Sequence, residues 1–365
     1  DELSAAMKFF AFRDRLRWRA IGLSRRVLGS RVARAEWNAL SAWRGLVHQA
    51  YQATPLQPNL CSDLWHQGNF SDPHSKKNFF TPNRREREPS SHHYGHDLQL
   101  KRFAGLPLVG PPLPVLLEHG LKVARSSRFE LPKAWARRGY FCMGSLRAQW
   151  LREEYGVPAW AIGPWINFAK PLLSADQMAA QRQFWGKTLL VVLAHSWDQV
   201  ERSMDLDACI SAVEAIAQIE NYQQVVWLRH WKDPEELPLP ESWVKACNGH
   251  RSNPWFLDAM RTLLELSDGL ASNAFGTHLG YGIALNKKLH WIDVEPMQHL
   301  EQLTPEKARE EEAEWAERQR LSQELRQALK LPAELQATTV NALLDPYWGL
   351  SEQPDAKAMA CLLSR

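Results

Sequence analysis

A stretch in the second half of the chain combines small polar residues, a glycine and a helical pattern in an order that suits phosphate binding. It runs from 266 to 285 and reads LSDGLASNAFGTHLGYGIAL. We expect a strand to end at Ser272 and a helix to begin near Thr277, with Gly276 in the turn. The unpaired N–H groups and the dipole of a helix start attract anions, and glycine allows a close backbone approach. An ordinary helix capped by Thr277 would use the same residues, so the spacing alone leaves both interpretations open.

Three other predicted strands also lead into polar or cationic residues. These are His195 and Ser196 after 188–194, Arg229 and Lys232 after 225–228, and Gly249, His250 and Arg251 after 243–247. Parallel strands present their carboxyl ends at one edge of a sheet, which is where ligands bind in open α/β sheets. A single histidine there is more often structural, but the convergence of several on one edge indicates a binding site.

Strands alternate with helical patterns along most of the chain, which favours an α/β fold with parallel sheets. The predicted strands are 114–118, 140–143 and 159–162 in the first half, and 188–194, 225–228, 243–247, 269–272 and 289–292 in the second. Helical spacing occurs at 147–155, 175–185, 206–219, 256–266, 277–285 and 305–330. The order in the second half is typical of a doubly wound domain. For 305–330, a charged helix, we expect either a solvated position or a path back across the molecule.

The length of 365 residues is too great for one ordinary core and suits two domains with extensions. We predict a basic helical extension at 1–52, one α/β domain at 53–173, a second at 174–300 and a helical segment at 301–365. No apolar run is long enough to span a bilayer, and no secretory leader pattern is evident. The five cysteines are far apart and form no CxxC pair, so a cytoplasmic protein without a zinc or disulfide framework is expected.

The segment 8–34 is strongly basic and has interleaved apolar residues at helical spacing. It holds nine Lys and Arg residues against the single acid Asp14. Such a helix could lie on an anionic membrane surface, as a peripheral contact on the inner face of the membrane. It could equally pack on the protein with a solvated basic face. Nucleic acid is not expected as a partner, because no nucleic-acid-binding motif accompanies the charge.

The run from Cys247 to Lys288 resembles GT-B-type glycosyltransferases of bacterial capsule and lipopolysaccharide biosynthesis. The matching elements there are Gly249-His250-Arg251, Phe256-Leu257, Ser267-Asp268, Ser272-Asn273, Gly276-Thr277-His278, Gly280-Tyr281 and Asn286-Lys287-Lys288. Further elements in the same order are 92–97 (HHYGHD), 117–120 (LEHG), 163–166 (GPWI) and 230–233 (HWKD). The resemblance covers about residues 90–295; the arginine expected before a leucine in the helix after the GHR turn is displaced to Arg261.

The resemblance implies two Rossmann-like domains that face a cleft, with helical N-terminal and C-terminal extensions. The domain at 174–300 would bind a nucleotide-sugar, and the domain at 53–173 would bind the acceptor. The implied donor-binding residues are His195, Ser196, Arg229, Lys232, Gly249, His250, Arg251, Ser272, Asn273, Gly276, Thr277 and His278. On the acceptor side we expect His93, His96, Asp97 and Trp165, as contacts to the acceptor or as structure of the cleft. No metal and no cofactor beyond the donor are expected, since helix starts and cations stabilise the leaving phosphate.

Glu118 and His119 are the candidate catalytic residues, because they end a predicted strand that faces the cleft. Glycosyl transfer with inversion needs a base to take the proton of the acceptor hydroxyl, and either side chain could do so. A buried Glu–His pair that holds a turn is the alternative. His93 and His96 have the spacing of a partial zinc site, but two histidines fall short of a complete ligand set.

The sequence therefore predicts a metal-independent glycosyltransferase that moves a sugar to a surface-glycan or lipid-linked acceptor. A CMP-linked acid sugar is the main variant of the donor, with His195 and Ser196 at its phosphate. Two other functions stay open: a nucleotide-sugar epimerase-like enzyme, and a catalytically silent binding subunit of a polysaccharide assembly complex.

Overall fold

The computed structural model of the protein describes residues 94–128, 138–196, 200–231, 233–234, 236–249 and 253–364, with a few positions between 12 and 49. Residues 50–93 and nearly all of the basic segment 8–34 lie outside the described residues. No helix in the described ranges is long and apolar enough to cross a membrane.

The first sheet is small and parallel, in the order β1-β2-β3. Its strands are β1 (Leu116–Leu117), β2 (Tyr140–Cys142) and β3 (Ala159–Ala161), each inside a predicted range. Helix α6 (Ser145–Tyr155) connects β2 to β3 and ends at Gly156 in the left-handed region, φ 61°. The 3-10 helix η2 (Trp165–Phe168) then begins the passage to the second sheet.

The second sheet is parallel and has the order β7-β6-β4-β8-β9. Its strands are β4 (Thr188–Val191), β6 (Gln224–Arg229), β7 (Val244–Cys247), β8 (Gly269–Ser272) and β9 (Lys288–Trp291). All residues of β4 and β8 are buried, which is why both read as apolar runs. The chain moves outward from β4 through β6 to β7 and then returns to place β8 on the other side of β4. That reversal creates a switch point between β4 and β8, where ligands bind in such sheets.

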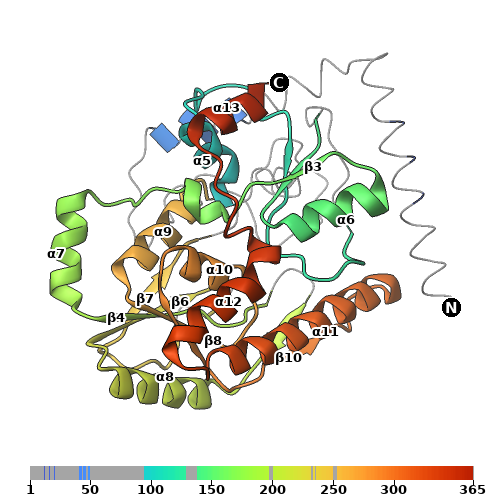
Figure 1. Cartoon of the computed structure of the whole chain (residues 1–365). Helices are drawn as coiled ribbons and strands as arrows, with labels where there is room; N and C mark the ends of the chain where they lie inside the picture. Colours follow the sequence, from blue (N-terminus) through green and yellow to red (C-terminus); the bar gives the residue numbers. More distant parts are fainter. Residues whose placement is uncertain are drawn as a thin grey trace, which may run out of the picture.

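The helices around the second sheet begin and end at recognisable sequence features. They are α7 (Ala175–Trp185), α8 (Leu206–Glu220), α9 (Phe256–Leu266) and α10 (Thr277–Ala284), shown around the sheet in Figure 1. Ser174 and Gln177 form a capping box at the start of α7, with bonds of 3.2 and 3.0 Å. Asp205 caps α8, which ends at Asn221 in the left-handed region.

Helix α5 (His96–Phe103) was not expected, since the segment around His93 and His96 lacks a clear helical pattern. The reason is that the buried face of α5 is polar. Asp97 is paired with the guanidinium of Arg44 at 2.9 Å, and Lys101 donates to Ser41 at 2.8 Å. Buried charges that find partners in another segment remove the apolar periodicity by which a helix is recognised in a sequence.

A short antiparallel pair was also not expected, whereas the segment 301–365 was predicted to be helical, without bounds for any helix after 330. The pair joins β5 (Glu201–Ser203) to β10 (Met297–His299). The charged helix predicted at 305–330 is α11 (Pro305–Ala328), and it is followed by α12 (Ala333–Trp348) and α13 (Ala356–Ser364). Figure 1 shows α11 and α12 side by side, with α12 in front of α10. Helix α12 also packs on α6 and α13 packs on α5, so the C-terminal segment runs back to the first sheet.

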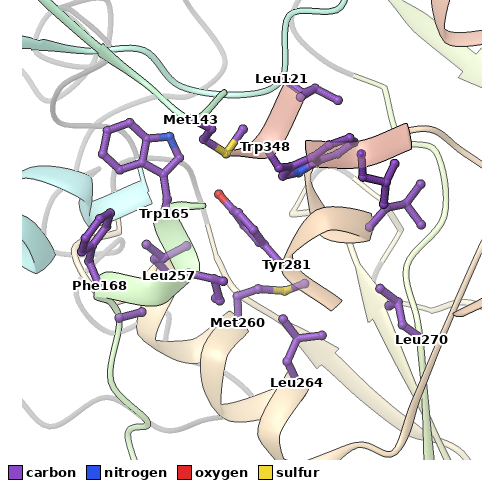
Figure 2. Close-up of a cluster of buried hydrophobic side chains, with 14 of the residues drawn as sticks. Leu121, Met143, Trp165, Phe168, Leu257, Met260, Leu264, Leu270, Tyr281 and Trp348 are labelled. Carbon is purple, nitrogen blue, oxygen red and sulfur yellow. The ribbon is translucent and has the colours of Figure 1, made fainter. Parts of the chain in front are cut away.

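One apolar core joins the two sheets. It includes Met143 and Trp165 from the first sheet and its exit, and Met260 and Tyr281 from α9 and α10. Figure 2 shows these side chains around the ring of Tyr281, with the indole of Trp348 above α10. A Cβ atom on Gly280 would lie 2.1 Å from the Trp348 ring, so glycine at this position is what lets α12 approach α10.

Candidate functional site

A cavity of about 1090 Å³ lies where the strands of both sheets end. The first sheet contributes Glu118 and His119, which directly follow β1. The second sheet contributes the segments after β4, β6, β7, β8 and β9, and α11 forms a further wall. The strand ends predicted to converge are therefore brought together at one cavity.

The start of α10 forms the wall nearest to the switch point. Gly276, Thr277 and His278 line the cavity. Ser272 lies behind them, fully buried, and its hydroxyl is 2.7 Å from Nε2 of His278. The first-turn N–H groups of a helix attract anions, and a neutral imidazole beside them can add one hydrogen bond. Ser272 thus positions His278 and does not itself face the cavity.

His278 is uncharged in the folded protein near neutral pH. Burial lowers its pKa to about 3, and the neighbouring His195 and Arg318 contribute in the same direction. A Cβ atom on Gly276 would lie 2.6 Å from the His278 ring. Glycine at 276 is therefore required by the position of this ring, in addition to the access that it gives to the backbone.

His195 and His230 stack on each other at the ends of β4 and β6. Their ring centroids are 4.0 Å apart and the planes differ by 6°. Nδ1 of His195 lies 2.8 Å from the Ser196 carbonyl oxygen. The Ser196 hydroxyl accepts from the backbone N–H of Arg202 at 2.9 Å, so this residue shapes the loop before β5 as well as lining the cavity.

Two arginines that the sequence did not single out stand beside the histidine pair. Arg202 donates to the His195 carbonyl at 3.1 Å, and burial together with Arg318 lowers its pKa to about 10. Arg318 of α11 donates to the carbonyl oxygens of Phe275 and Leu121, which belong to opposite walls. Glu314 lies 3.6 Å from Arg318 and offsets part of the repulsion between the two cations, and an anionic ligand would offset more of it.

The end of β6 is organised by Asp233. Its carboxylate accepts from the His230 backbone N–H at 2.7 Å, and its carbonyl accepts from Arg229 at 3.1 Å. Burial raises the pKa of Asp233 above its usual value. Arg229, His230 and Trp231 line the cavity beside Gly249, in the part that lies over β6 and β7.

Asn273 lines the cavity but uses its side chain within the fold. Its Oδ1 accepts from the Ala194 N–H at 2.9 Å, and its Nδ2 donates to the Val294 carbonyl at 3.0 Å. The side chain therefore connects the segments that follow β4 and β9. This arrangement favours a positioning role for Asn273 over direct contact with a ligand.

On the opposite wall, Glu118 is committed to an ion pair. The guanidinium of Arg147 donates to its carboxylate at 2.8 to 3.1 Å, and also to the carbonyls of Ser127 and Arg128. Arg147 is buried and Glu118 is largely buried. His119 lines the same wall, with its ring 6.0 Å from that of Tyr94. The base candidates therefore differ, because the carboxylate of Glu118 is held by the guanidinium of Arg147, whereas His119 takes no part in that ion pair.

The predicted acceptor-side residues divide between cavity and core. His96 lines the cavity and stacks on Trp165, with ring centroids 4.4 Å apart, and burial lowers its pKa to about 3. Trp165 and Asp97 do not line the cavity: Trp165 is in the apolar core and Asp97 is paired with Arg44. Their positions favour structure of the cleft over contact with an acceptor.

Four predicted site residues lie outside the described residues: His93, Lys232, His250 and Arg251. In the described ranges, no cluster of three or more His, Cys, Asp or Glu residues is arranged to hold a metal ion. Glu311 of α11 is a cavity residue that the sequence did not single out; burial raises its pKa, as does the neighbouring Glu314. The helical spacing of 305–330 was the only feature of the sequence that bore on the position of Glu311.

No protein-family model matches the chain, and no curated protein matches its sequence. Among solved structures, it is similar to Phytolacca americana UGT2 complexed with UDP-2fluoro-glucose and pterostilbene. The two are 13% identical, the TM-score is 0.27, and the match covers 64% of this chain and 51% of that one. The chain thus spans about half the length of that protein. At this level of similarity, any assignment of function must be supported by the residues of the cavity.

Proposed function

We propose that the protein is a glycosyltransferase of the GT-B kind, which moves a sugar from a nucleotide-sugar to a surface-glycan or lipid-linked acceptor without a divalent metal. The observation that carries the proposal is the wall formed by the α10 start, His278, Arg202 and Arg318. These groups face Glu118 and His119 across one cavity. The capsule and lipopolysaccharide setting, the predicted domain boundaries and the peripheral membrane contact of 8–34 are parts of the same proposal.

The diphosphate of the donor would lie at the α10 start. The switch point between β4 and β8 is the expected position for a phosphate, and three cationic or hydrogen-bonding side chains surround it: His278, Arg202 and Arg318. The nucleoside would extend over β6 and β7, where Trp231 and Gly249 line the cavity. An indole face offers a stacking surface for a base.

His119 is the base that we favour for the transfer step. It would take the proton of the acceptor hydroxyl as that oxygen bonds to the anomeric carbon of the donor. The bond from that carbon to the phosphate oxygen breaks, and the diphosphate leaves with the bonding electrons. Arg318 and the α10 N–H groups would stabilise the negative charge of the leaving group. Glu118 then serves to hold Arg147 and the turn that carries His119.

Calorimetric titration of UDP, GDP and CMP in the presence of EDTA tests the donor site. We expect one of them to bind, and the Arg318→Gln variant to bind it about tenfold or more weakly through loss of a charge-assisted contact. Arg320→Gln is the matched control, since Arg320 lies on the same helix but is paired with Glu317 and Glu324 outside the cavity. If the wild-type protein binds none of the three nucleotides, the donor site is wrongly assigned.

Product analysis separates the transferase from its alternatives. A transferase releases free nucleotide faster when a glycan or lipid-linked acceptor is added. An epimerase-like enzyme would convert the sugar while the nucleotide stays attached, and a silent subunit would bind nucleotide without either reaction. The polarised cavity with a histidine on the opposite wall favours transfer over the two alternatives.

A further inference from the structure

Helix α11 presents a polar stripe to the cavity, in addition to the apolar seam by which it is anchored. The seam consists of Leu321, Leu325 and Ala328, all buried. The stripe consists of Trp315, Arg318, Gln319, Ser322, Gln323 and Arg326, all of which line the cavity. Spacings of three and four residues place them on one side of the helix. Gln323 is exposed and the other members of the stripe are partly buried, so this face of α11 is open both to solvent and to a polar ligand in the cavity.

The two cations of the stripe already have partners. Arg318 donates to the carbonyls of Phe275 and Leu121, and Arg326 is paired with Asp293. In contrast, no hydrogen bond is found for the side chains of Gln319, Ser322 or Gln323 within the described part of the chain. Two amides and a hydroxyl therefore offer both donors and acceptors to the cavity.

Trp315 adds an aromatic surface to the stripe. Its ring lies 5.1 Å below the guanidinium of Arg202, which is held in turn by Gln298 at 3.0 Å. Trp291, at the end of β9, lines the same cavity. Indole faces pack against the C–H faces of sugar rings, while amides and hydroxyls match groups that both donate and accept hydrogen bonds.

We propose that the stripe on α11 binds an uncharged oligosaccharide. A polyanion is disfavoured, because Glu311 also lines the cavity and Arg326 is already paired with Asp293. A peptide would need an open strand edge or apolar pockets, and the stripe offers neither. From Trp315 to Arg326 the helix rises about 16 Å, at about 1.5 Å per residue, which is longer than one sugar ring.

The saccharide held here is the acceptor of the transfer. That part of the inference rests on the proposed function, whereas the binding of a saccharide does not. The acceptor would then lie along α11, between the α10 start and the end of β9, and not at Asp97 or Trp165. Arg318 belongs both to the stripe and to the proposed phosphate site at the α10 start. An acceptor on α11 could therefore bring a terminal hydroxyl to the donor.

A printed array of uncharged, sulfated and sialylated oligosaccharides tests the inference on the full-length protein. The variants are Gln319→Ala with Gln323→Ala, and as control Gln327→Ala, which removes the same kind of side chain from a position of α11 that does not line the cavity. UDP, GDP and CMP affinities are measured for each variant, and thermal unfolding confirms that each is folded.

We expect the wild-type protein to bind uncharged oligosaccharides, and the double variant to bind them about tenfold or more weakly because two hydrogen-bonding groups are lost. Gln327→Ala should stay within about twofold of wild type, as is usual for surface changes. Binding only to sulfated or sialylated glycans, binding to none, or an equal loss in the control would overturn the inference. Saccharide binding without nucleotide binding would support it while refuting the proposed donor site.

Discussion

The ion pair between Glu118 and Arg147 allows a test of whether Glu118 stabilises the fold or acts as the catalytic base. Arg147 is 3% exposed and Glu118 is 11% exposed, and the closest N–O distance is 2.8 Å. Glu118→Gln keeps the shape of the side chain but leaves the guanidinium buried without its counter-ion. Loss of one member of a buried pair costs about 3–5 kcal/mol. Because the carbonyls of Ser127 and Arg128 still hold Arg147, we expect about 3 kcal/mol, the lower end of that range.

The assay is urea unfolding of Glu118→Gln, Arg147→Met and the double variant, with nucleotide release measured in parallel. Both single variants should unfold at lower urea than wild type, and the double variant should recover part of the loss, because neither charge is then left alone. His119→Asn should unfold like wild type but lose transfer by about 10²- to 10⁴-fold, the usual contribution of a general base.

One result would refute this reasoning. If Glu118→Gln unfolds at the wild-type urea concentration and yet loses transfer by about a hundredfold or more, the pair does not hold the fold, and Glu118 is the base. His119→Asn would then be expected to retain most of the activity. The two outcomes assign the proton transfer to different atoms, so the pair of measurements decides between them.

Three further predictions follow from close contacts and buried histidines. Gly280→Ala should destabilise the protein by about 1–3 kcal/mol in calorimetric melting, because its Cβ would overlap the Trp348 ring; an unchanged Tm would show that α12 is not packed there. Gly276→Ala should displace the His278 ring and weaken nucleotide binding by about tenfold, and unchanged affinity would remove His278 from the site. His96 has a pKa lowered by burial to about 3 from about 6.5, so below pH 6.5 the unfolded state takes up a proton that the folded state does not. By pH 5 this costs about 2 kcal/mol (about 1.5 units at about 1.36 kcal/mol each), a loss that should be absent in His96→Gln when unfolding free energies at pH 7 and pH 5 are compared.

Strands β4 and β8 of the second sheet were predictable because all of their residues are buried. The runs 269–272 and 256–266 coincide with β8 and α9 to the residue. The strand predicted at 188–194 ends earlier, at Val191, and its last residues turn toward the cavity. Buried parallel strands give continuous apolar runs, which can be recognised in a sequence. Strands β5 and β10 pair over a long sequence separation and have half-exposed side chains, so no local pattern predicts them.

The candidate site was predictable only where it follows from strand ends. His195, Arg229 and Thr277 line the cavity because they lie beyond a parallel strand, at the end of one, and at the start of the helix that follows one, respectively. The sequence could not tell that Asp97 would be neutralised by Arg44, since the two are 53 positions apart. A role that depends on a partner far away in the sequence cannot be predicted from a local pattern.

The position of α11 is a second feature that a local sequence pattern could not predict. Its charges suggested a helix that is either solvated or runs back across the molecule, and it proves to be a wall of the cavity. Through Arg318 this helix also connects Leu121, beyond the first sheet, to Phe275, before α10. The segment that carries His119 is therefore connected to the segment before α10 by a side chain that belongs to neither sheet. Strand ends determine which groups can meet in this cavity, while the C-terminal helices determine how far apart they are held.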